Sequence, residues 1–444
     1  MSTSNLEPAI IGVSDCADCL PTLGSRVWIT GFPRDEHDEL VGLVERAGYV
    51  PTPFATGASA ILAPFPPSPS LLQDAERAGR QVLSPASFRE TDRERPRRTA
   101  IEVDDETVRI LDVTLPRRAA GTTRLLPDER FANLCLDATF LAAARTVAIA
   151  ARHRLPCVLE GDTAVSKTTA VLWVAHLCRQ ESVRLNLNGQ SDTGELVGRY
   201  VPGTVTGEAS WRFWEGIVPD AMRHGRWVVL DELNLAEPQV LERLNPVLEQ
   251  HPSLILSEHL GERFGCGGDV PLADDFSIFG TMNPSEFAGR SVLSPAFRDR
   301  WSVWQILEAP GEIEYRALLT RLVHGSHPSF VLDGIEWQAP DSAPIHPALA
   351  NEPGIDGLLD RIAAFHTSVS SAASELGRSR RERYVFTRRT MLATMTLLAA
   401  AVSRGARVEA AARQAIEISY LQRVQPGADR QALRTAVRSA GLSR

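Results

Sequence analysis

The chain has 444 residues, 43% of them hydrophobic and 23% charged, with a formal net charge of −8 at pH 7. This length predicts about two to four domains, each large enough to bury its own core. The acidic balance argues against a general nucleic-acid-binding surface, although it says nothing against a local basic groove. No apolar run approaches the roughly 18 residues of a membrane-spanning helix, so no membrane partner is expected.

Residues 1–21 show no periodicity and predict a flexible leader. They lack the basic start and continuous apolar core of a secretory signal, which favours a cytoplasmic protein. The 6 cysteines are too few and too scattered for a disulfide framework, so we expect reduced thiols. Cys16 and Cys19 have the spacing of half a zinc site, but no second ligand pair follows, and we expect no metal there.

The segment 22–91 predicts a small α/β domain, because short apolar runs and helical spacings follow the order β-α-β-β-α-β. That order fits a three-layer domain with a parallel sheet. The expected strands cover 26–30, 49–54, 60–63 and 81–83, and the expected helices cover 38–47 and 71–78.

This segment resembles a BRCT domain. The similar residues are Ile29-Thr-Gly31, Ala47-Gly48-Tyr49, Ala75 with Gly79, and Val82 to Phe88. Many BRCT domains bind phosphopeptides through a Ser/Thr-Gly pair and a lysine, and Thr30-Gly31 matches the pair. Leu71 stands near the place of the lysine, so the resemblance favours a protein-docking module without phosphate recognition.

The next segment, 92–129, predicts a linker followed by a strand or hairpin. Residues 91–98 are charged and contain a proline, whereas residues 108–115 alternate apolar and polar side chains. A helix is then expected over 136–153, leading directly into a buried strand at 156–159.

A phosphate-binding loop follows that strand and opens an apolar helix, the order that the Walker A motif requires. In such a loop, backbone N–H groups and the helix N-terminus cradle phosphate, a lysine reaches the β- and γ-phosphate oxygens, and a hydroxyl holds Mg²⁺. The predicted nucleotide-binding residues are Gly161, Asp162, Thr163, Ala164, Val165, Ser166, Lys167, Thr168 and Thr169.

Lys167 is the only lysine among 47 lysines and arginines. Arginine can replace lysine on most solvated surfaces, but a broad guanidinium cannot replace a compact ammonium among phosphates. Ser166 departs from the motif, which has glycine there. A non-glycine residue at positive φ costs about 1 kcal/mol or more, so slower turnover is one expected consequence.

Two further strands end in polar residues suited to a nucleotide site. The apolar run 227–230 leads into Asp231 and Glu232, the Walker B arrangement, in which the first carboxylate organises Mg²⁺ and the second polarises the attacking water. The run 276–280 leads to Asn283, expected beside the γ-phosphate. We therefore predict metal ligation by Thr168 and Asp231.

Three arginines complete the predicted catalytic set. Arg298 and Arg300 follow the second of these strands, as a finger that reaches a neighbouring subunit's site would. Arg389 opens a helix in the C-terminal region, where it would sense the nucleotide from the helical lid. Each arginine alone could be ordinary surface charge. Chance does not explain why the phosphate loop, the carboxylate pair, Asn283 and the arginines all occur in this order.

Residues 130–424 together resemble the AAA+ ATPases of the MoxR-type and midasin-type branch. The resemblance implies an α/β P-loop domain over 130–307, a helical lid over 308–444, ATP and Mg²⁺ as cofactors, and a β-hairpin at about 251–274. It also implies a hexameric ring of this chain that remodels a protein client, with a von Willebrand A-domain protein as a partner of several members.

Some nearby side chains favour a structural interpretation. Trp211, Phe213 and Trp214 could grip a client, but aromatic residues this close in sequence are more often core, and we predict core. His251 and His259 on the expected hairpin are predicted to be solvated.

Two other functions stay open at this point. Slow turnover at Ser166 could make the chain a nucleotide-dependent scaffold, although such a scaffold would have no need of Glu232. BRCT and AAA+ modules also occur together in clamp loaders, which raises a DNA-associated motor. The acidic net charge and the lack of interleaved aromatic and basic residues argue against the motor.

Overall fold

The computed structural model describes two compact units. Residues up to Arg98 group with Ser329–Gln338, and Thr99–Pro328 groups with Ala339–Arg444. The described residues are 25–30, 32–47, 49–52, 58–64, 69–78, 80–85, 96–119, 121, 123–127, 131, 134–163, 165–205, 208–284, 292–373, 376 and 384–443. The predicted leader and the Cys16/Cys19 pair lie outside these ranges.

The first unit contains a four-stranded parallel sheet with the order β2-β1-β3-β4. Its elements are β1 (Arg26–Ile29), α1 (Arg34–Arg46), β2 (Val50–Thr52), β3 (Ala60–Leu62), α2 (Pro69–Arg77) and β4 (Gln81–Leu83). Leu62 packs in one core with Leu40 and Val44 of α1, whereas Ile61 packs in another with Ala75 of α2. Adjacent strand residues point to opposite faces, so the two helices cover opposite faces and the predicted three layers are present.

Residues 329–338 belong to this first unit rather than to the helical region in which the sequence placed them. They form β18 (Ser329–Leu332) and β19 (Ile335–Gln338), and β19 pairs with β5 (Arg97–Thr99) in a three-stranded sheet. The ion pair from Arg97 Nε to Glu336 Oε2, at 2.7 Å, joins β5 to β19.

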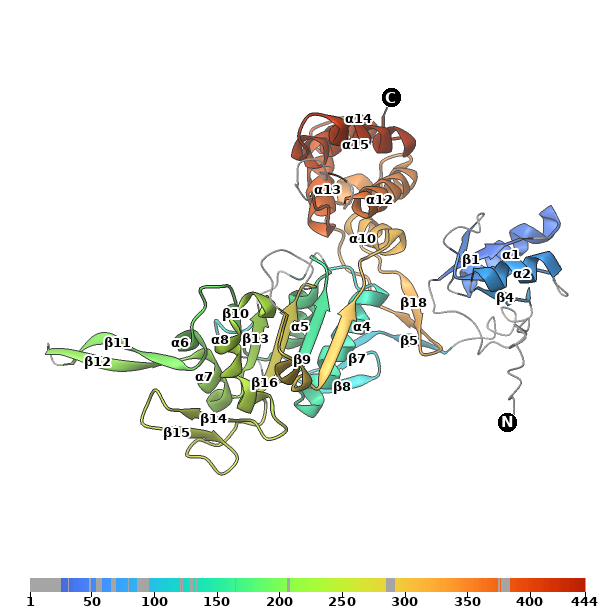
Figure 1. Cartoon of the computed structure of the whole chain (residues 1–444). Helices are drawn as coiled ribbons and strands as arrows, with labels where there is room; N and C mark the ends of the chain where they lie inside the picture. The colour runs from blue at the N-terminus through green and yellow to red at the C-terminus, as the bar shows by residue number, and fades with distance from the viewer. Residues whose placement is uncertain are drawn as a thin grey trace, which may run out of the picture. The chain divides into compact units, whose positions relative to one another are not determined.

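The second unit is built on a five-stranded parallel sheet with the order β10-β13-β16-β9-β17, at the centre of Figure 1. These strands are β9 (Cys157–Gly161), β10 (Ser182–Asn186), β13 (Trp227–Asp231), β16 (Ser277–Met282) and β17 (Val303–Leu307). Every residue of β13 and β16 is buried, as continuous apolar runs in a covered parallel sheet require. The sheet is flanked by α4 (Ala138–His153), α5 (Lys167–Leu177), α6 (Thr193–Leu196), α7 (Ile217–His224), α8 (Pro238–Glu242) and α9 (Pro295–Asp299).

A small antiparallel sheet, β6-β7-β8, precedes α4 in this unit. Its strands are β6 (Ile101–Val103), β7 (Thr107–Ile110) and β8 (Val113–Pro116), and the last two form the hairpin predicted at 108–115.

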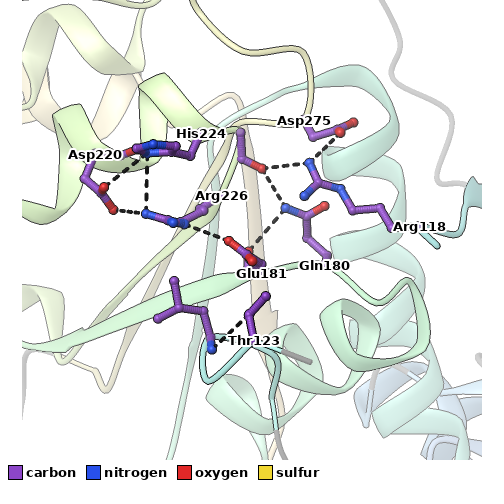
Figure 2. Close-up of polar contacts among 10 residues, drawn as sticks. Arg118, Thr123, Gln180, Glu181, Asp220, His224, Arg226 and Asp275 are labelled. Atoms are coloured by element: carbon purple, nitrogen blue, oxygen red, sulfur yellow. Dashed lines mark hydrogen bonds and ion pairs between the residues drawn. The ribbon is translucent and has the colours of Figure 1, made fainter. Parts of the chain in front are cut away.

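Figure 2 shows a network of charged and polar side chains. Two of its members, Glu181 and Arg226, directly precede β10 and β13, so the network lies where these two strands begin. Arg226 Nε donates to Glu181 Oε2 at 2.8 Å, and the same guanidinium is bonded to Asp220 of α7. Gln180 Nε2 donates to the carbonyl oxygen of Gly225 at 2.7 Å. These bonds join the start of β10 to the end of α7, so this network is structural and fixes the strand that carries Asp231.

Two hairpins extend from the second unit, and the longer one, β11 with β12, reaches away from the sheet (Figure 1). Its strands are β11 (Gly198–Val205) and β12 (Glu208–Glu215), and the shorter hairpin consists of β14 (Ser253–Leu256) and β15 (Glu262–Gly265). The shorter one lies within the hairpin predicted at 251–274.

The predicted burial of the β12 tryptophans is wrong. Trp211 and Trp214 are 70% and 63% exposed, because neither side chain is covered by another part of the described structure, while Phe213 is partly buried. His259 is only partly exposed, because its ring stacks on Phe213 with centroids 4.3 Å apart. His251 is exposed, as predicted.

The C-terminal helices form their own core, as predicted for the lid. They are α10 (Glu312–His324), α11 (Pro347–Ala350), α12 (Ile355–Ala372), α13 (Arg388–Val402), α14 (Val408–Ser419) and α15 (Ala428–Ser439). Leu319, Leu358, Met391 and Tyr420 are among the fully buried residues of that core. The predicted fold class, an α/β protein with a parallel sheet flanked by helices and a helical C-terminal region, is therefore confirmed.

Within the described ranges, no helix has the length and apolarity to cross a membrane. The same residues contain no cluster of three or more His, Cys, Asp or Glu side chains suited to a metal ion.

Candidate functional site

The predicted phosphate loop lies between β9 and α5, and Lys167 is the first residue of α5. The side chain of Lys167 is buried, and its Nζ donates to the carbonyl oxygens of Gly161 at 2.7 Å and Asp162 at 2.8 Å. Nζ also donates to Asn283 Oδ1 at 2.7 Å. The ammonium is thus held between the loop and the end of β16, two segments far apart in the sequence.

Glycine is required at 161 because the neighbouring strand lies close to it. A Cβ atom at Gly161 would come within 2.6 Å of the carbonyl oxygen of Leu307, at the end of β17. The loop can therefore begin at this point only without a side chain.

Ser166 has the left-handed conformation that the sequence predicted, with φ 68° and ψ 23°. It is the residue just before α5, where glycine would adopt this conformation without the steric cost to Cβ. A serine held there stores about 1 kcal/mol of strain, or somewhat more, at the edge of the site.

Replacing Ser166 with Gly should remove that strain, and we expect ATP binding or turnover to improve by up to about fivefold, the factor for roughly 1 kcal/mol. Nucleotide titration and steady-state phosphate release measure the two effects. Arg154→Gly is the matched control, because Arg154 also has positive φ, 54°, but lies at the end of α4. Weaker binding, or no change in either binding or turnover, by Ser166→Gly would mean that the loop has adapted to serine.

Asp231 ends β13 and accepts hydrogen bonds at both carboxylate oxygens. Oδ1 accepts from Thr168 Oγ1 at 2.9 Å and from Thr281 Oγ1, and Oδ2 accepts from the guanidinium of Arg184. Burial by itself raises the pKa of Asp231, but the bonds from Thr281 and Arg184 outweigh it and hold the pKa below its usual value. The carboxylate is therefore ionised at neutral pH.

Asn283 follows β16 and lies between the lysine and the second carboxylate. Its Nδ2 is 3.5 Å from Glu232 Oε1, while its Oδ1 accepts from Lys167. The buried Asn234 donates from Nδ2 to the backbone oxygen of Asn283 at 2.8 Å. Asn234 was missed as a positioning residue, although its place three residues after Asp231 was the available signal.

A cavity of about 560 Å³ opens beside these groups. It is lined by Leu134, Cys135, Thr163, Ser166, Lys167, Thr168, Thr169, Leu172, Arg184, Asn186, Asp231, Glu232, Asn283, Leu318, Arg388, Arg389 and Leu392. This volume lies within the range of small-molecule and cofactor sites. Residues of the predicted phosphate loop and the two carboxylates thus share one cavity with apolar residues from the C-terminal helices.

The predicted residues do not all line this cavity. Gly161 and Asp162 contact the site through their carbonyl bonds to Lys167, the loop residue Val165 is buried, and Ala164 lies outside the described residues. Arg389 is exposed and does line it.

Arg298 and Arg300 are the two predicted residues that lie away from the cavity. The guanidinium of Arg298 lies 4.5 Å from the ring centroid of Trp304, and Arg300 Nε donates to Glu249 Oε1 at 2.8 Å. Neither arginine can act on the cavity of its own chain from this position.

Several residues of the cavity were not predicted from the sequence. Arg388, beside Arg389, is buried and pairs with Asp137 Oδ2 at 2.7 Å. Leu134 and Cys135 supply part of the apolar wall, and burial raises the pKa of the Cys135 thiol to about 12, which leaves it protonated and unreactive. No local pattern marks these positions, because they meet only when the C-terminal helices fold against the segment before α4.

The residues fit a nucleotide with Mg²⁺. Hard oxygen atoms suit Mg²⁺, and the Thr168 hydroxyl and the Asp231 carboxylate supply them 2.9 Å apart. The N-terminus of α5 and the ammonium of Lys167 provide the positive potential that phosphate requires.

Comparison with known proteins finds similarity in the part of the chain that holds this site. Residues 156–301 match the family model of the AAA domain of the dynein-related subfamily. The chain is 37% identical over 168 residues to midasin of Giardia intestinalis and 36% identical over 148 residues to midasin of Dictyostelium discoideum. The matched segments are 37% and 33% of this chain but only 3% and 2% of those midasins.

A bacterial protein matches over a stretch of similar length. The uncharacterized protein YojN of Bacillus subtilis is 24% identical over 164 residues, which are 37% of this chain and 51% of YojN. The chain thus spans about half of that relative and a small part of the midasins. Residues 156–301, which hold the phosphate loop, both carboxylates and Asn283, therefore form an AAA domain of the dynein-related subfamily.

Proposed function

We propose that this chain binds ATP with Mg²⁺ in the cavity and hydrolyses it to ADP and phosphate. The observation that carries the proposal is the hydrogen-bonded series from Lys167 through Asn283 to Glu232, beside the Thr168–Asp231 pair. A lysine, an amide and two carboxylates are the groups that phosphoryl transfer to water requires.

In the proposed mechanism each group acts on one part of the reaction. Lys167 leaves the loop carbonyls for the β- and γ-phosphate oxygens, and the α5 N-terminus binds phosphate through backbone N–H groups. Glu232 polarises the attacking water, and Asn283 orients it or the γ-phosphate. Thr168 and Asp231 would hold Mg²⁺, which supplies the charge that neutralises the phosphates when it is bound.

The chain is proposed to work as a ring, because Arg298 and Arg300 lie away from their own cavity. An arginine supplied to a neighbour's site stabilises the charge that develops on the transferred phosphoryl group. Arg300 is the preferred finger, with Arg298 second, and a hexamer is the expected assembly.

Phosphate release from Mg-ATP, measured over a range of protein concentration, tests the proposed function. Shared sites predict that turnover per chain rises as rings form, and that added Arg300→Ala chains poison wild-type rings. Phosphate release at the no-protein background at every concentration would contradict hydrolysis.

Remodelling of a protein client is the finer part of the proposal. Trp211 and Trp214 lie exposed on the long hairpin, and exposed aromatic side chains are suited to gripping unfolded polypeptide. The double variant Trp211→Ser with Trp214→Ser should bind a permanently unfolded polypeptide several-fold more weakly in fluorescence anisotropy. The nucleotide affinity of the double variant should be unchanged. Equal binding of the polypeptide by the wild type and the double variant would show that the hairpin does not grip the client.

The remaining parts of the proposal rest on resemblance. The first unit would be a BRCT-like docking module, the AAA domain would be of the MoxR branch, and a von Willebrand A-domain protein in the cytoplasm would be a partner. The alternatives are a scaffold that binds ATP without turnover and a DNA-associated motor. Turnover above the Glu232→Gln level argues against the scaffold, and lack of duplex DNA binding at low salt argues against the motor.

A further inference from the structure

Arg184 is a cation at the site that the proposed chemistry does not use. It lies on β10 next to β13, where it is paired in register with Val229, two residues before Asp231. Its side chain is 50% exposed and lines the cavity. The guanidinium donates to Asp231 Oδ2 from Nε, at 3.1 Å, and from Nη2.

The two oxygens of Asp231 are divided between different donors. Oδ1 receives the hydroxyls of Thr168 and Thr281, which are neutral, whereas Oδ2 receives the charged guanidinium. Hydrogen bonds from a charged guanidinium to a carboxylate oxygen are stronger than hydrogen bonds from neutral hydroxyl groups. Arg184 therefore neutralises the same carboxylate charge to which a divalent cation would bind.

Mg²⁺ and the Arg184 guanidinium compete for the carboxylate of Asp231. Mg²⁺ is small, demands near-octahedral geometry and keeps several waters, so it and its waters need the space and lone pairs on the cavity side of Asp231. A positive guanidinium at that place also repels the approaching cation. Because half of the Arg184 side chain is exposed, it can move into solvent at small cost.

On this basis, and resting on the proposed function, we infer that Arg184 is a tethered counter-cation of Asp231 that competes with Mg²⁺ and so sets the Mg²⁺ concentration at which nucleotide is loaded. The residue is a positioning residue, since it acts through Asp231 and not on the phosphates. Its presence makes the site respond to free Mg²⁺ and keeps the Asp231 carboxylate oriented when Mg²⁺ is scarce.

The test uses a fluorescent ADP analogue, which is bound but not hydrolysed. Its binding to the full chain is titrated with Mg²⁺ from an EDTA-buffered start. Arg184→Met should lower the half-saturating Mg²⁺ concentration about three- to tenfold, the worth of a half-exposed charge-assisted pair, while Mg²⁺-free ADP affinity stays the same. Arg184→Lys, which keeps the charge, should stay nearer to wild type.

Arg199→Met is the matched control. The Arg199 side chain is 58% exposed and forms an ion pair with Asp192 at an N–O distance of 3.5 Å, and neither residue lines the cavity. This variant should leave the Mg²⁺ requirement unchanged. An unchanged or raised Mg²⁺ requirement in Arg184→Met would overturn the inference, and so would a loss of Mg²⁺-free ADP affinity, which would make Arg184 a phosphate ligand. Failure of the wild-type chain to bind ADP at any Mg²⁺ concentration would instead overturn the proposed function.

Discussion

Replacing Glu232 with Gln is expected to lower ATP turnover at least about a hundredfold, the usual contribution of a positioned general base, while ATP binding is kept. Glutamine has the same shape and can still contact Asn283, but it cannot accept a proton or polarise water as a carboxylate does. Steady-state phosphate release and equilibrium ATP binding, measured on the same preparation, separate the two effects.

The position of Glu232 supports this expectation. Its backbone has φ 57°, an uncommon conformation for a non-glycine residue, directly after the buried strand β13. Such strain at the end of a strand aims the side chain at the cavity. Glu237→Gln is the control, since Glu237 lies a few residues on, before α8, and does not line the cavity. Equal turnover in wild type and Glu232→Gln would contradict the assignment of the base.

Replacing Arg388 with Met is expected to destabilise the chain by about 3–5 kcal/mol, because it leaves Asp137 buried without its partner. The pair is 10% and 3% exposed at its two side chains. Asp137 also caps α4 by accepting from the backbone N–H of Phe140. The ion pair thus joins α13 of the C-terminal helices to the first helix that covers the sheet.

Urea unfolding followed by circular dichroism measures this loss, and Arg389→Met provides the comparison. Arg389 is adjacent but exposed, so its replacement should change stability by less than about 0.5 kcal/mol, as for a typical surface site. Arg389→Met should instead weaken ATP binding. Similar stabilities for the two variants would show that the buried pair does not hold the helices to the sheet.

The part of the site that could be predicted consists of residues whose positions follow from the secondary structure around them. A loop between a buried strand and a helix is visible in the sequence, and polar residues such as Asp231 and Asn283 at the ends of apolar strands meet because parallel strands end at the same edge of a sheet. The positive φ of Ser166 followed from the glycine that the motif has there. These features needed only secondary structure and strand direction.

The unpredicted part depends on tertiary contacts. Arg184 contacts Asp231 only because β10 is next to β13 in the sheet. Arg388 pairs with Asp137, which lies 251 residues earlier in the sequence. The exposure of Trp211 could not be read from composition, because apolar spacing is the same whether or not a helix covers the hairpin. Residues 329–338 gave no sign that they would pair with β5.

ATP binding by the wild type and by Lys167→Ala, in the presence of Mg²⁺, tests the central claim most directly. Wild type should bind ATP, and the variant should bind about tenfold to a hundredfold more weakly or not measurably, because the charged hydrogen bonds of the ammonium to phosphate are lost. Circular dichroism should show that the variant is folded. Equal ATP affinity in the two proteins would contradict the assignment of the cavity as a nucleotide site.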